Sequence, residues 1–433
     1  MTKLPNAFIE NMKKQLPDNE WEAFFAVYGR KPYKGVRLNP LKDEPARVAA
    51  KLPFLGERVA WEENGYYTQA EKIGATVYHH AGLIYSQEPS AMCAAPLLDV
   101  RAGERVLDLC SAPGGKGTRL AADLQGDGII VLNEPIFARA KILSQNVERM
   151  GIKNAVVTCE YPQALSARFQ GYFDKIMVDA PCSGEGLFRK NAEEALSEWS
   201  EENVALCARR QAEILDHAVK MLRVGGKLVY STCTFSEAED GGQVRDHLQK
   251  HPYMRLIKEE KIYPHKQAGE GHYAALFERV QAGEERPVKQ AKRSVSLASE
   301  KAYRAFERAF FKGVFARNLH EVNGVLYELP QGVFDWKGLN VLRVGVRLGE
   351  VKNGRFEPCH ALAMSAKAGE CNAVLYLNID DARVEKYLRG ETLDADMQNG
   401  WCIVCADGYP IGLGKAVNGT VKNHLPKGLR KLG

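Results

Sequence analysis

Residues 106–120, VLDLCSAPGGKGTRL, constrain the possible folds more than any other stretch of the chain. The apolar run from Val106 to Leu109 is typical of a parallel strand that is covered on both faces, and Pro113-Gly114-Gly115 cannot continue such a strand. A glycine turn between a strand and a helix lets a ligand approach bare backbone, with the N–H groups of the helix's first turn facing it. The stretch therefore predicts an open α/β sheet with a cofactor site at the carboxyl end of its first strand.

Three glycine-loop chemistries compete for this stretch. A phosphate-binding P-loop needs Gly at the position of Cys110 and Ser or Thr directly after Lys116, where Gly117 stands instead. The dinucleotide fingerprint Gly-x-Gly-x-x-Gly does not match glycines at 114, 115 and 117. A class I methyltransferase loop for S-adenosylmethionine needs an acid at the end of the second strand, and Glu134 follows the apolar residues 128–132. These residues favour the methyltransferase loop, and a structural turn with an incidental glutamate stays open as the alternative.

Length and composition indicate a globular protein of two or three domains. The chain has 433 residues, of which 45% are hydrophobic and 26% charged, and its formal net charge is +5. No apolar run approaches the ~18 residues of a membrane span, and residues 1–15 read as a mixed helix rather than a signal sequence. Ten cysteines at scattered spacings then argue for free thiols. We expect a cytoplasmic monomer without membrane association.

The chain after the glycine loop alternates between helices and strands. The pattern predicts helices over residues 136–150 and 204–222, and strands over 155–159, 172–179 and 227–232, the last after a turn at Gly225-Gly226. Such alternation is typical of a Rossmann-like doubly wound parallel sheet.

Unusual residues follow the predicted strands. Glu134, Glu160 and Asp179 stand at three strand ends, Cys182 lies in a Pro-Cys loop after Asp179, and Cys233 ends the next strand. Because the carboxyl ends of parallel strands line the ligand crevice, these side chains should converge there. A structural role for both cysteines is the competing interpretation, but two thiols at neighbouring strand ends beside a methyl donor would be a narrow coincidence.

The flanking regions carry weaker signals. Residues 6–30 predict two short amphipathic helices, and residues 31–42 hold four cations and no acid, so they could meet phosphate or form a solvated loop. Residues 281–300 read as a linker, residues 301–320 as a helix, and the later glycine-separated apolar runs as a small barrel-like β domain. The tail from residue 409 contains no acid and could bind phosphate or be solvated; its cations are Lys415, Lys422, Lys427, Arg430 and Lys431.

Two groups of potential metal ligands do not have the arrangement that a metal site needs. His79 and His80 are adjacent and cannot share one helical face. Cys402 and Cys405 form a Cys-x-x-Cys inside an apolar strand, and no second Cys-x-x-Cys follows. We therefore expect no metal.

Three motifs in order, Cys110-Ser-Ala-Pro-Gly-Gly-Lys116, Asp179-Ala-Pro-Cys-Ser-Gly-Glu-Gly186 and Ser231-Thr-Cys-Thr234, resemble the Nol/Nop/Sun family of RNA cytosine-5 methyltransferases. Flanking motifs such as Arg37-Leu-Asn-Pro40 and Tyr263-Pro-His-Lys266 are similar to bacterial members that modify 16S ribosomal RNA. The resemblance therefore covers nearly the whole chain. One departure is Glu239-Asp-Gly241, where the family commonly has Glu-Asn-Glu, so the role of that acidic segment is open.

The resemblance implies an architecture and a partner. We expect an N-terminal RNA-contacting region over residues 1–90, a class I methyltransferase core over 91–280, a linker over 281–300 and a PUA-like RNA-binding domain over 301–433. The implied partner is 16S ribosomal RNA or the small ribosomal subunit, and the implied cofactor is S-adenosylmethionine.

The resemblance also implies roles for individual residues. Carbon 5 of cytosine is a poor nucleophile, so a thiolate must first add to carbon 6. Cys233 is the implied nucleophile, Cys182 acts in product release, and Asp179 hydrogen-bonds the protonated ring nitrogen of cytosine. Lys116 is a candidate for lowering the pKa of a thiol from its usual value of about 8.5. The expected cofactor-binding residues are Cys110, Ser111, Ala112, Pro113, Gly114, Gly115, Lys116, Glu134, Arg139, Glu160 and Asp179.

Two other functions remain open. A tRNA cytosine-5 methyltransferase would share every catalytic motif, so only the flanking regions favour ribosomal RNA. A non-catalytic RNA-binding assembly factor would not need both thiols, the acid and the glycine loop. In either enzyme the target base has to leave its stack to reach the crevice.

Overall fold

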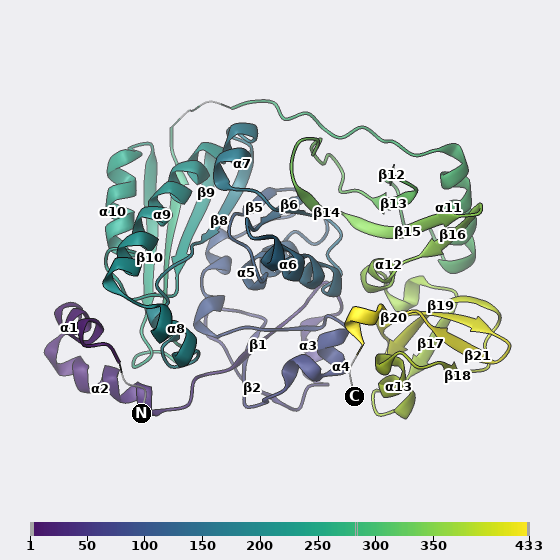
Figure 1. The fold of residues 1–433 in the computed structure, drawn as a ribbon, viewed down its shortest axis with the longest axis horizontal. Coiled ribbons are helices and arrows are strands. Elements are labelled where there is room, and N and C mark those ends of the chain that lie inside the picture. The colour runs from purple at the N-terminus through teal and green to yellow at the C-terminus, as the bar shows by residue number, and fades with distance from the viewer. Residues whose placement is uncertain (1–3, 282, 284, 431–433) are drawn as a thin grey trace.

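An eight-stranded sheet forms the centre of the molecule (Figure 1), in a computed structural model that describes residues 4–281, 283 and 285–430. The strand order is β10-β11-β9-β8-β5-β6-β7-β14. β5 lies between β8 and β6, and all three run parallel, so the strand order reverses at β5 and opens a crevice outside the carboxyl ends. The strands are β5 (Arg105–Asp108), β6 (Ile129–Asn133), β7 (Ala155–Thr158), β8 (Phe173–Asp179), β9 (Leu222–Thr232), β10 (Met254–Ile262), β11 (His272–Arg279) and β14 (Val341–Val344).

Helices cover both faces of this sheet. They are α5 (Gly115–Asp123), α6 (Phe137–Arg149), α7 (Pro162–Arg168), α9 (Glu201–Met221) and α10 (Gly241–Lys250), whereas α8 (Ala192–Glu198) contacts the loop after β8. Neighbouring residues of β5 belong to different cores, because Val106 packs on one face of the sheet and Leu107 on the other. The predicted doubly wound α/β fold is thus confirmed, including the strand that is buried on both faces.

The turn predicted at Gly225-Gly226 is instead part of a strand. Gly225 and Gly226 belong to β9 itself, and Gly225 has φ 72°. The pairing with β8 shifts there, since Leu222 lies opposite Phe173 and Lys227 opposite Lys175. The glycines therefore lie at an irregularity within the strand. β9 begins directly after α9, so no separate loop connects the two elements.

The N-terminal region consists of two helices and a small sheet. Both predicted helices are present, as α1 (Asn6–Gln15) and α2 (Trp21–Ala26). Their Phe8 and Phe24 pack with Phe188 and Phe235, which follow the two thiol-bearing strand ends. The sheet has the order β2-β3-β1-β4, with β1 (Gly35–Leu38), β2 (Leu55–Arg58), β3 (Gly65–Thr68) and β4 (Ile84–Ser86), next to α3 (Pro45–Ala49) and α4 (Val77–His80).

The C-terminal unit contains two sheets around a shared core. The four-stranded sheet contains β12 (Leu319–Val322), β13 (Val325–Glu328), β15 (Val346–Lys352) and β16 (Arg355–Pro358), and the five-stranded sheet β17 (Val374–Leu377), β18 (Leu393–Asp394), β19 (Gly400–Ala406), β20 (Tyr409–Val417) and β21 (Thr420–Asn423). The helices are α11 (Leu297–Phe310), α12 (His360–Ser365) and α13 (Ala382–Arg389). α11 is shorter than the predicted helix over residues 301–320, because Phe311 is extended and pairs with Cys371.

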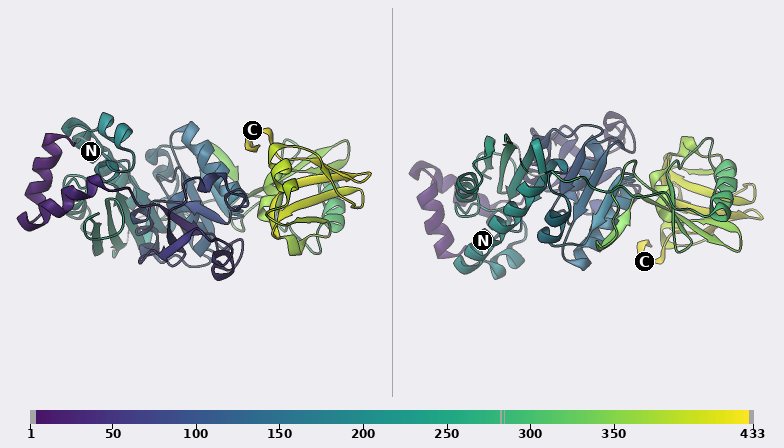
Figure 2. Two further views of the ribbon diagram at one scale, coloured as in Figure 1. Left: turned by 90° about the horizontal axis from the view of Figure 1, so that it is seen from below. Right: turned by 90° about the horizontal axis from the view of Figure 1, so that it is seen from above.

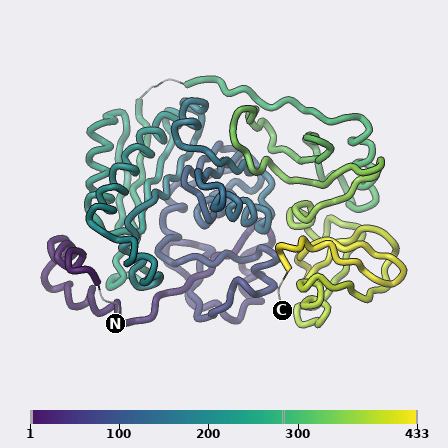
Figure 3. The backbone as a smooth tube through the Cα atoms, viewed as in Figure 1, coloured from purple at the N-terminus to yellow at the C-terminus, as the bar shows by residue number. Residues whose placement is uncertain are grey.

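The C-terminal unit contacts both other parts of the chain. β14 leaves it to pair antiparallel with β7, at the edge of the central sheet. Leu38 of the N-terminal sheet and Leu377 of β17 belong to one hydrophobic cluster, and the Tyr409 hydroxyl lies 2.8 Å from Asp43 Oδ2. Figure 2 shows the resulting elongated shape, with the N-terminal helices and the C-terminal sheets at opposite ends, and Figure 3 the path of the chain along one side to α11. No helix among the described residues combines the length and the apolarity needed to cross a membrane.

Candidate active site

A cleft with a volume of about 760 Å³ opens at the carboxyl ends of the parallel strands. Residues from the ends of five strands, β5 to β9, line it, together with parts of α8 and α9. Of the predicted site residues, the cleft is lined by Cys110, Ala112, Glu134, Arg139, Asp179, Cys182 and Cys233.

The glycine loop lies at the centre of the crevice. Ser111 N–H donates to the Asn133 carbonyl at 2.8 Å, which fixes the loop against β6. Gly114 has φ 115° and caps α5, a conformation that side chains rarely adopt. A Cβ on Gly117 would stand 2.5 Å from Ser111 Oγ and from Leu132, so only glycine allows the helix to pack this closely. Of the loop, Cys110 and Ala112 line the cleft, whereas Ser111, Pro113, Gly114, Gly115 and Lys116 are not among its lining residues, so their direct contact with the cofactor stays a prediction.

Glu134 is buried at the end of β6, and its carboxylate is held in place. The Ile136 N–H donates to Glu134 Oε1 at 3.0 Å, and Arg139 Nη1 lies 3.4 Å from Oε2. Arg139 also donates to the Ala112 carbonyl at 3.1 Å. The acid, the arginine and the glycine loop thus form one hydrogen-bonded wall of the cleft.

Glu160 lies at the end of β7 and meets a residue of the C-terminal unit. Asn340 donates to Glu160 Oε1 from its backbone N–H at 2.6 Å and from its side-chain amide at 3.1 Å. Glu160 is not among the residues that line the cleft, whereas the next residue, Tyr161, is. A direct cofactor contact by Glu160 stays a prediction.

The two predicted catalytic thiols lie together. Cys182 Sγ and Cys233 Sγ are 3.2 Å apart, and the Cys233 N–H points at Cys182 Sγ at 3.3 Å. The hydrogen bond with Cys233 and, as a smaller cause, burial raise the pKa of Cys182 well above that of a free thiol. The order of the strands explains this meeting, because β8 and β9 are neighbours.

Lys116, which is buried, and Asp179, which is partly exposed, form an ion pair beside the thiols. Lys116 Nζ lies 2.9 Å from Asp179 Oδ2, and Ser231 Oγ donates to Asp179 Oδ1 at 2.8 Å. Burial by itself would raise the pKa of Asp179, but Lys116, His272 and the hydrogen bonds lower it below its ordinary value. Asp179 is therefore an ionised acceptor at the edge of the cleft.

His272 is a residue of this site to which the sequence assigned no role. Tyr273 pairs with Thr232, so His272 lies next to Cys233 across the sheet. Its ring is buried, and neither nitrogen has a hydrogen-bond partner in the part of the chain that the structure describes. Burial and the charge of Lys116 lower the pKa of His272 to about 3, so the imidazole is neutral. The motif Gly269-Glu-Gly-His272 was the available signal.

The basic segments differ in how they could meet phosphate. Arg37 is buried and donates to the Gly115 carbonyl at 2.9 Å and to Thr118 Oγ1 at 2.7 Å, so it supports the glycine loop instead. In the tail, Lys415 and Lys422 are exposed and lie directly opposite each other on β20 and β21. Lys431, which belongs to the same predicted surface, lies outside the described residues.

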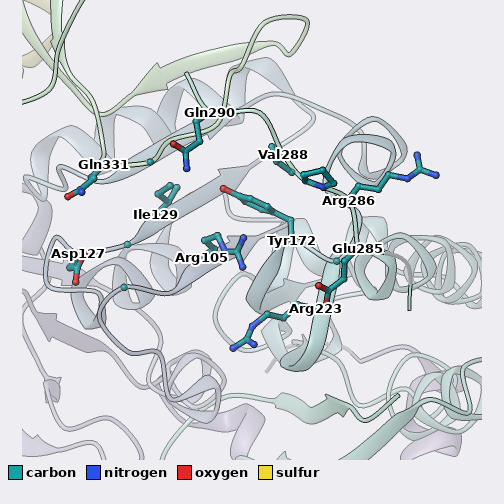
Figure 4. Close-up of a pocket in the computed structure, with 15 residues that line it drawn as sticks. Arg105, Asp127, Ile129, Tyr172, Arg223, Glu285, Arg286, Val288, Gln290 and Gln331 are labelled. Atoms are coloured by element: carbon teal, nitrogen blue, oxygen red, sulfur yellow. The ribbon is translucent and has the colours of Figure 1, made fainter. Parts of the chain in front are cut away.

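Two further features lie away from the thiols. Cys402 and Cys405 of β19 belong to different hydrophobic clusters, so they face opposite sides of the strand. A second cleft of about 740 Å³ lies near the amino ends of the parallel strands, under residues 285–290. Figure 4 shows Arg105 and Tyr172 near its centre, and the Arg105 guanidinium lies 4.5 Å from the Tyr172 ring centroid. Neither feature shares a residue with the predicted catalytic site.

Sequence comparisons identify the family. Residues 4–89 match a model described as the N-terminal domain of 16S rRNA methyltransferase RsmF, and residues 95–278 match one described as 16S rRNA methyltransferase RsmB/F. Residues 305–365 match the first C-terminal domain of RsmF, and residues 375–431 match the RsmF PUA domain. The ribosomal RNA small subunit methyltransferase F of Vibrio vulnificus is 30% identical over 98% of this chain and 97% of its own. The chain belongs to the RsmB/F family of methyltransferases. The predicted resemblance is thereby confirmed, as is the presence of a PUA-like domain near the C-terminus, although the PUA model matches only residues 375–431 of the predicted 301–433 and a separate model matches residues 305–365.

Other relatives agree with this assignment. The ribosomal RNA small subunit methyltransferase F of a Shewanella species is 29% identical over 100% of this chain and 98% of its own. The crystal structure of NSun6 from Pyrococcus horikoshii with SFG has a TM-score of 0.58 and 21% identity, covering 64% of this chain and 99% of that one, and thus shares the fold.

This RsmB/F member is an S-adenosylmethionine-dependent methyltransferase, as predicted. Its residues fit that cofactor, because Cys110 and Ala112 of the glycine loop line one cleft together with the fixed carboxylate of Glu134. Residues 110–115, Glu134 and Asp179 would hold the cofactor, which supplies the methyl group.

Proposed function

We propose that this chain methylates carbon 5 of a cytosine in 16S ribosomal RNA through a covalent adduct with Cys233. The relatives named for ribosomal RNA align with the whole chain, which supports the RNA class over tRNA. The pair of thiols 3.2 Å apart beside the cofactor cleft is the observation that carries the proposal. A methyltransferase acting on a more nucleophilic atom would need no such pair.

The reaction follows from the chemistry of the pyrimidine ring. The Cys233 thiolate adds to carbon 6, and carbon 5 becomes an enamine-like nucleophile that accepts the methyl group. The proton on carbon 5 then leaves to a base, the double bond between carbons 5 and 6 forms again, and the electrons of the carbon–sulfur bond return to Cys233. One methyl group is gained and one proton is lost.

The ion pair at Asp179 suits the adduct. Addition at carbon 6 pushes electrons toward ring nitrogen 3, which then takes up a proton. Asp179 is ionised and can accept a hydrogen bond from this N–H, while Lys116 and Ser231 hold the carboxylate in place. The burial of Lys116 in this pair also places a cation near Cys233.

The protonation state of Cys182 argues against it as the attacking group. The raised pKa of Cys182 keeps it a neutral thiol at physiological pH, so it is a poor attacking group. A neutral S–H beside the adduct can instead act when the carbon–sulfur bond of Cys233 breaks. The proposed nucleophile is therefore Cys233, and Cys182 acts in release.

The test compares single cysteine variants on 16S ribosomal RNA and small subunits. Cys233→Ala should lose both methyl transfer and the covalent RNA adduct. Cys182→Ala should instead trap methylated RNA on the protein, visible as a slowly migrating band on a denaturing gel. Cys371→Ala, at a buried cysteine of the C-terminal core, is the matched control and should behave as wild type. An adduct lost in Cys182→Ala and trapped in Cys233→Ala would exchange the two roles.

A further inference from the structure

Two buried carboxyl groups, Glu185 and Glu239, flank the residues that follow the two thiols. Ser183 follows Cys182 and Thr234 follows Cys233, and their hydroxyl oxygens lie 2.9 Å apart. Each hydroxyl also contacts a carboxyl group, so a chain of four oxygen-bearing side chains links the loop after β8 to the end of β9.

Glu185 contacts donors on both of its oxygens. The indole N–H of Trp199 donates to Oε1 at 3.0 Å. The Phe235 N–H donates to Oε2 at 3.1 Å, and Thr234 Oγ1 lies 3.0 Å from the same oxygen. Since the two N–H groups cannot accept a hydrogen bond, this arrangement requires an ionised carboxylate that accepts from all three.

Glu239 has donors on only one oxygen. The Ser183 N–H and the Gln211 side-chain amide both donate to Oε2 at 2.9 Å. Oε1 instead faces hydroxyl oxygens, with Ser183 Oγ at 2.5 Å and Thr234 Oγ1 at 3.5 Å. A hydroxyl oxygen can accept as well as donate, so Oε1 can carry a proton.

A count of protons decides between the two states of Glu239. The chain from Glu239 through Ser183 and Thr234 to Glu185 contains three close oxygen–oxygen contacts, and each needs one proton. The two hydroxyl groups supply only two protons. The third must come from a carboxyl group, and Oε1 of Glu239 is the position where a proton conflicts with no N–H donor. The hydrogen bonds then all run in one direction: the Glu239 carboxyl group donates to Ser183, the Ser183 hydroxyl donates to Thr234, and the Thr234 hydroxyl donates to Glu185.

We propose that Glu239 is a positioning residue that carries a proton on Oε1 and, through Ser183 and Thr234, holds Cys182 beside Cys233. The proposal deepens the proposed function, because it rests on both thiols acting in the reaction. It also assigns a role to the acidic segment at 239–241, whose role the sequence left open.

The surrounding contacts agree with a bracing role. Gln211 donates from one amide nitrogen to both Glu239 and the Pro181 carbonyl, the latter at 3.0 Å, so it clamps the residue before Cys182. The Tyr230 hydroxyl donates to the Glu239 carbonyl at 2.6 Å, which fixes the segment to β9. Glu239 is thus connected to the loop before Cys182 through its carboxyl group and to β9 through its backbone carbonyl.

A neutral Glu239 also suits the charge of the site. Burial raises the pKa of both Glu239 and Glu185 above their ordinary values, so the hydrogen-bond donors around each group decide which of the two carries the proton. Among the described residues, the ionisable groups that interact with it are the thiols of Cys182 and Cys207, the carboxyl groups of Glu185 and Asp240, of which Asp240 pairs with Lys261, and the phenol of Tyr230. None of these supplies a cation, so a second carboxylate here would oppose thiolate formation at Cys233.

The experiment compares Glu239→Gln, Glu239→Ala and Glu185→Gln in the full chain. A glutamine amide copies a protonated carboxyl group, because its N–H can donate to Ser183 and its oxygen can accept from Ser183 N–H and Gln211. The same change at Glu185 would turn an amide N–H toward N–H donors. Glu307→Gln is the control, because Glu307 is a buried carboxylate in the C-terminal unit that accepts from the N–H groups of Phe315 and Ala316.

Three readouts are measured: the melting temperature, the pH profile of iodoacetamide alkylation at Cys233 followed by peptide mass spectrometry, and kcat on ribosomal RNA with KM for the cofactor. Glu239→Gln should keep kcat within about threefold of wild type, with an unchanged alkylation midpoint. Glu239→Ala should lose at least tenfold in kcat with little change in the cofactor KM. Glu185→Gln should lower the melting temperature by several degrees, and Glu307→Gln should do so without altering alkylation.

Two results overturn the proposal. If Glu239→Gln is as impaired as Glu239→Ala, or if its alkylation midpoint falls to lower pH, Glu239 is ionised in the wild-type protein. If Glu239→Ala equals wild type in kcat, Glu239 does not position the thiols. Wild-type protein that fails to methylate ribosomal RNA would count against the proposed function, whereas the alkylation and melting readouts would still decide the state of Glu239.

Discussion

Replacement of Glu134 tests the cofactor site most directly. The carboxylate is buried at the cleft, where the Ile136 N–H and Arg139 fix its orientation. In the position of the second-strand acid, it would accept hydrogen bonds from the ribose hydroxyl groups of S-adenosylmethionine. Hydrogen bonds to a charged acceptor contribute about 1.5–3 kcal/mol. Glu134→Ala should therefore weaken cofactor binding by about 10- to 150-fold.

The assay is isothermal titration calorimetry with S-adenosylmethionine or its demethylated product. Glu148→Ala is a matched control, since Glu148 is a carboxylate on the following helix, α6, that pairs with Arg343 instead of the cleft. The melting temperature shows whether the unpaired Ile136 N–H disturbs the loop. A folded Glu134→Ala protein whose Kd stays within threefold of wild type would refute the role of Glu134.

Three other perturbations test separate parts of the structure. The double substitution Lys415→Glu with Lys422→Glu should weaken ribosomal RNA binding as measured by filter binding. If each lysine contacts one phosphate, the slope of log K against log salt concentration should become less steep by roughly 1.4–1.8. An unchanged slope would mean that the tail is solvated and does not contact RNA. These substitutions are preferable to deleting the tail, because β21 belongs to the five-stranded sheet. Asn340→Ala removes the side-chain amide donor to buried Glu160, keeps the backbone N–H donor, and should destabilise the protein by about 0.5–1.5 kcal/mol in urea unfolding; equal stability would show that the side-chain contact contributes nothing. The pKa of His272 falls from 6.5 to about 3 on folding, so the unfolded chain binds the extra proton between these values and stability falls as the pH is lowered through this window. The loss attributable to His272 should reach roughly 2–3 kcal/mol near pH 4.5, and His272→Gln should remove it from the difference between unfolding at pH 7.5 and pH 4.5; an unchanged difference would contradict a neutral buried imidazole.

The sequence was most informative about the carboxyl edge of the sheet. The alternation of helices and strands predicts parallel neighbours, and parallel neighbours bring their carboxyl ends together. That reasoning places Glu134, Asp179, Cys182 and Cys233 around one crevice, and the cleft contains all four. The ion pair between Lys116 and Asp179 also lies at this edge.

Contacts between distant segments were not predictable in the same way. Asn340 reaches Glu160 from 180 positions away, and nothing local in either segment signals the contact. The basic stretch around Arg37 shows the same limit, because a cation pattern does not tell whether the side chain meets phosphate or the Gly115 carbonyl. His272 joins the site only because β11 pairs with β9 in a particular register.

The eighth strand of the central sheet has a consequence for synthesis on the ribosome. β14 is translated roughly 180 residues after β7, its partner. At a translation rate of about 5–20 residues per second, one edge of β7 stays without its partner strand for on the order of 10–40 s. During that interval the nascent chain exposes a strand edge that can pair with another chain. The C-terminal unit, when it emerges, ends this period by completing the sheet.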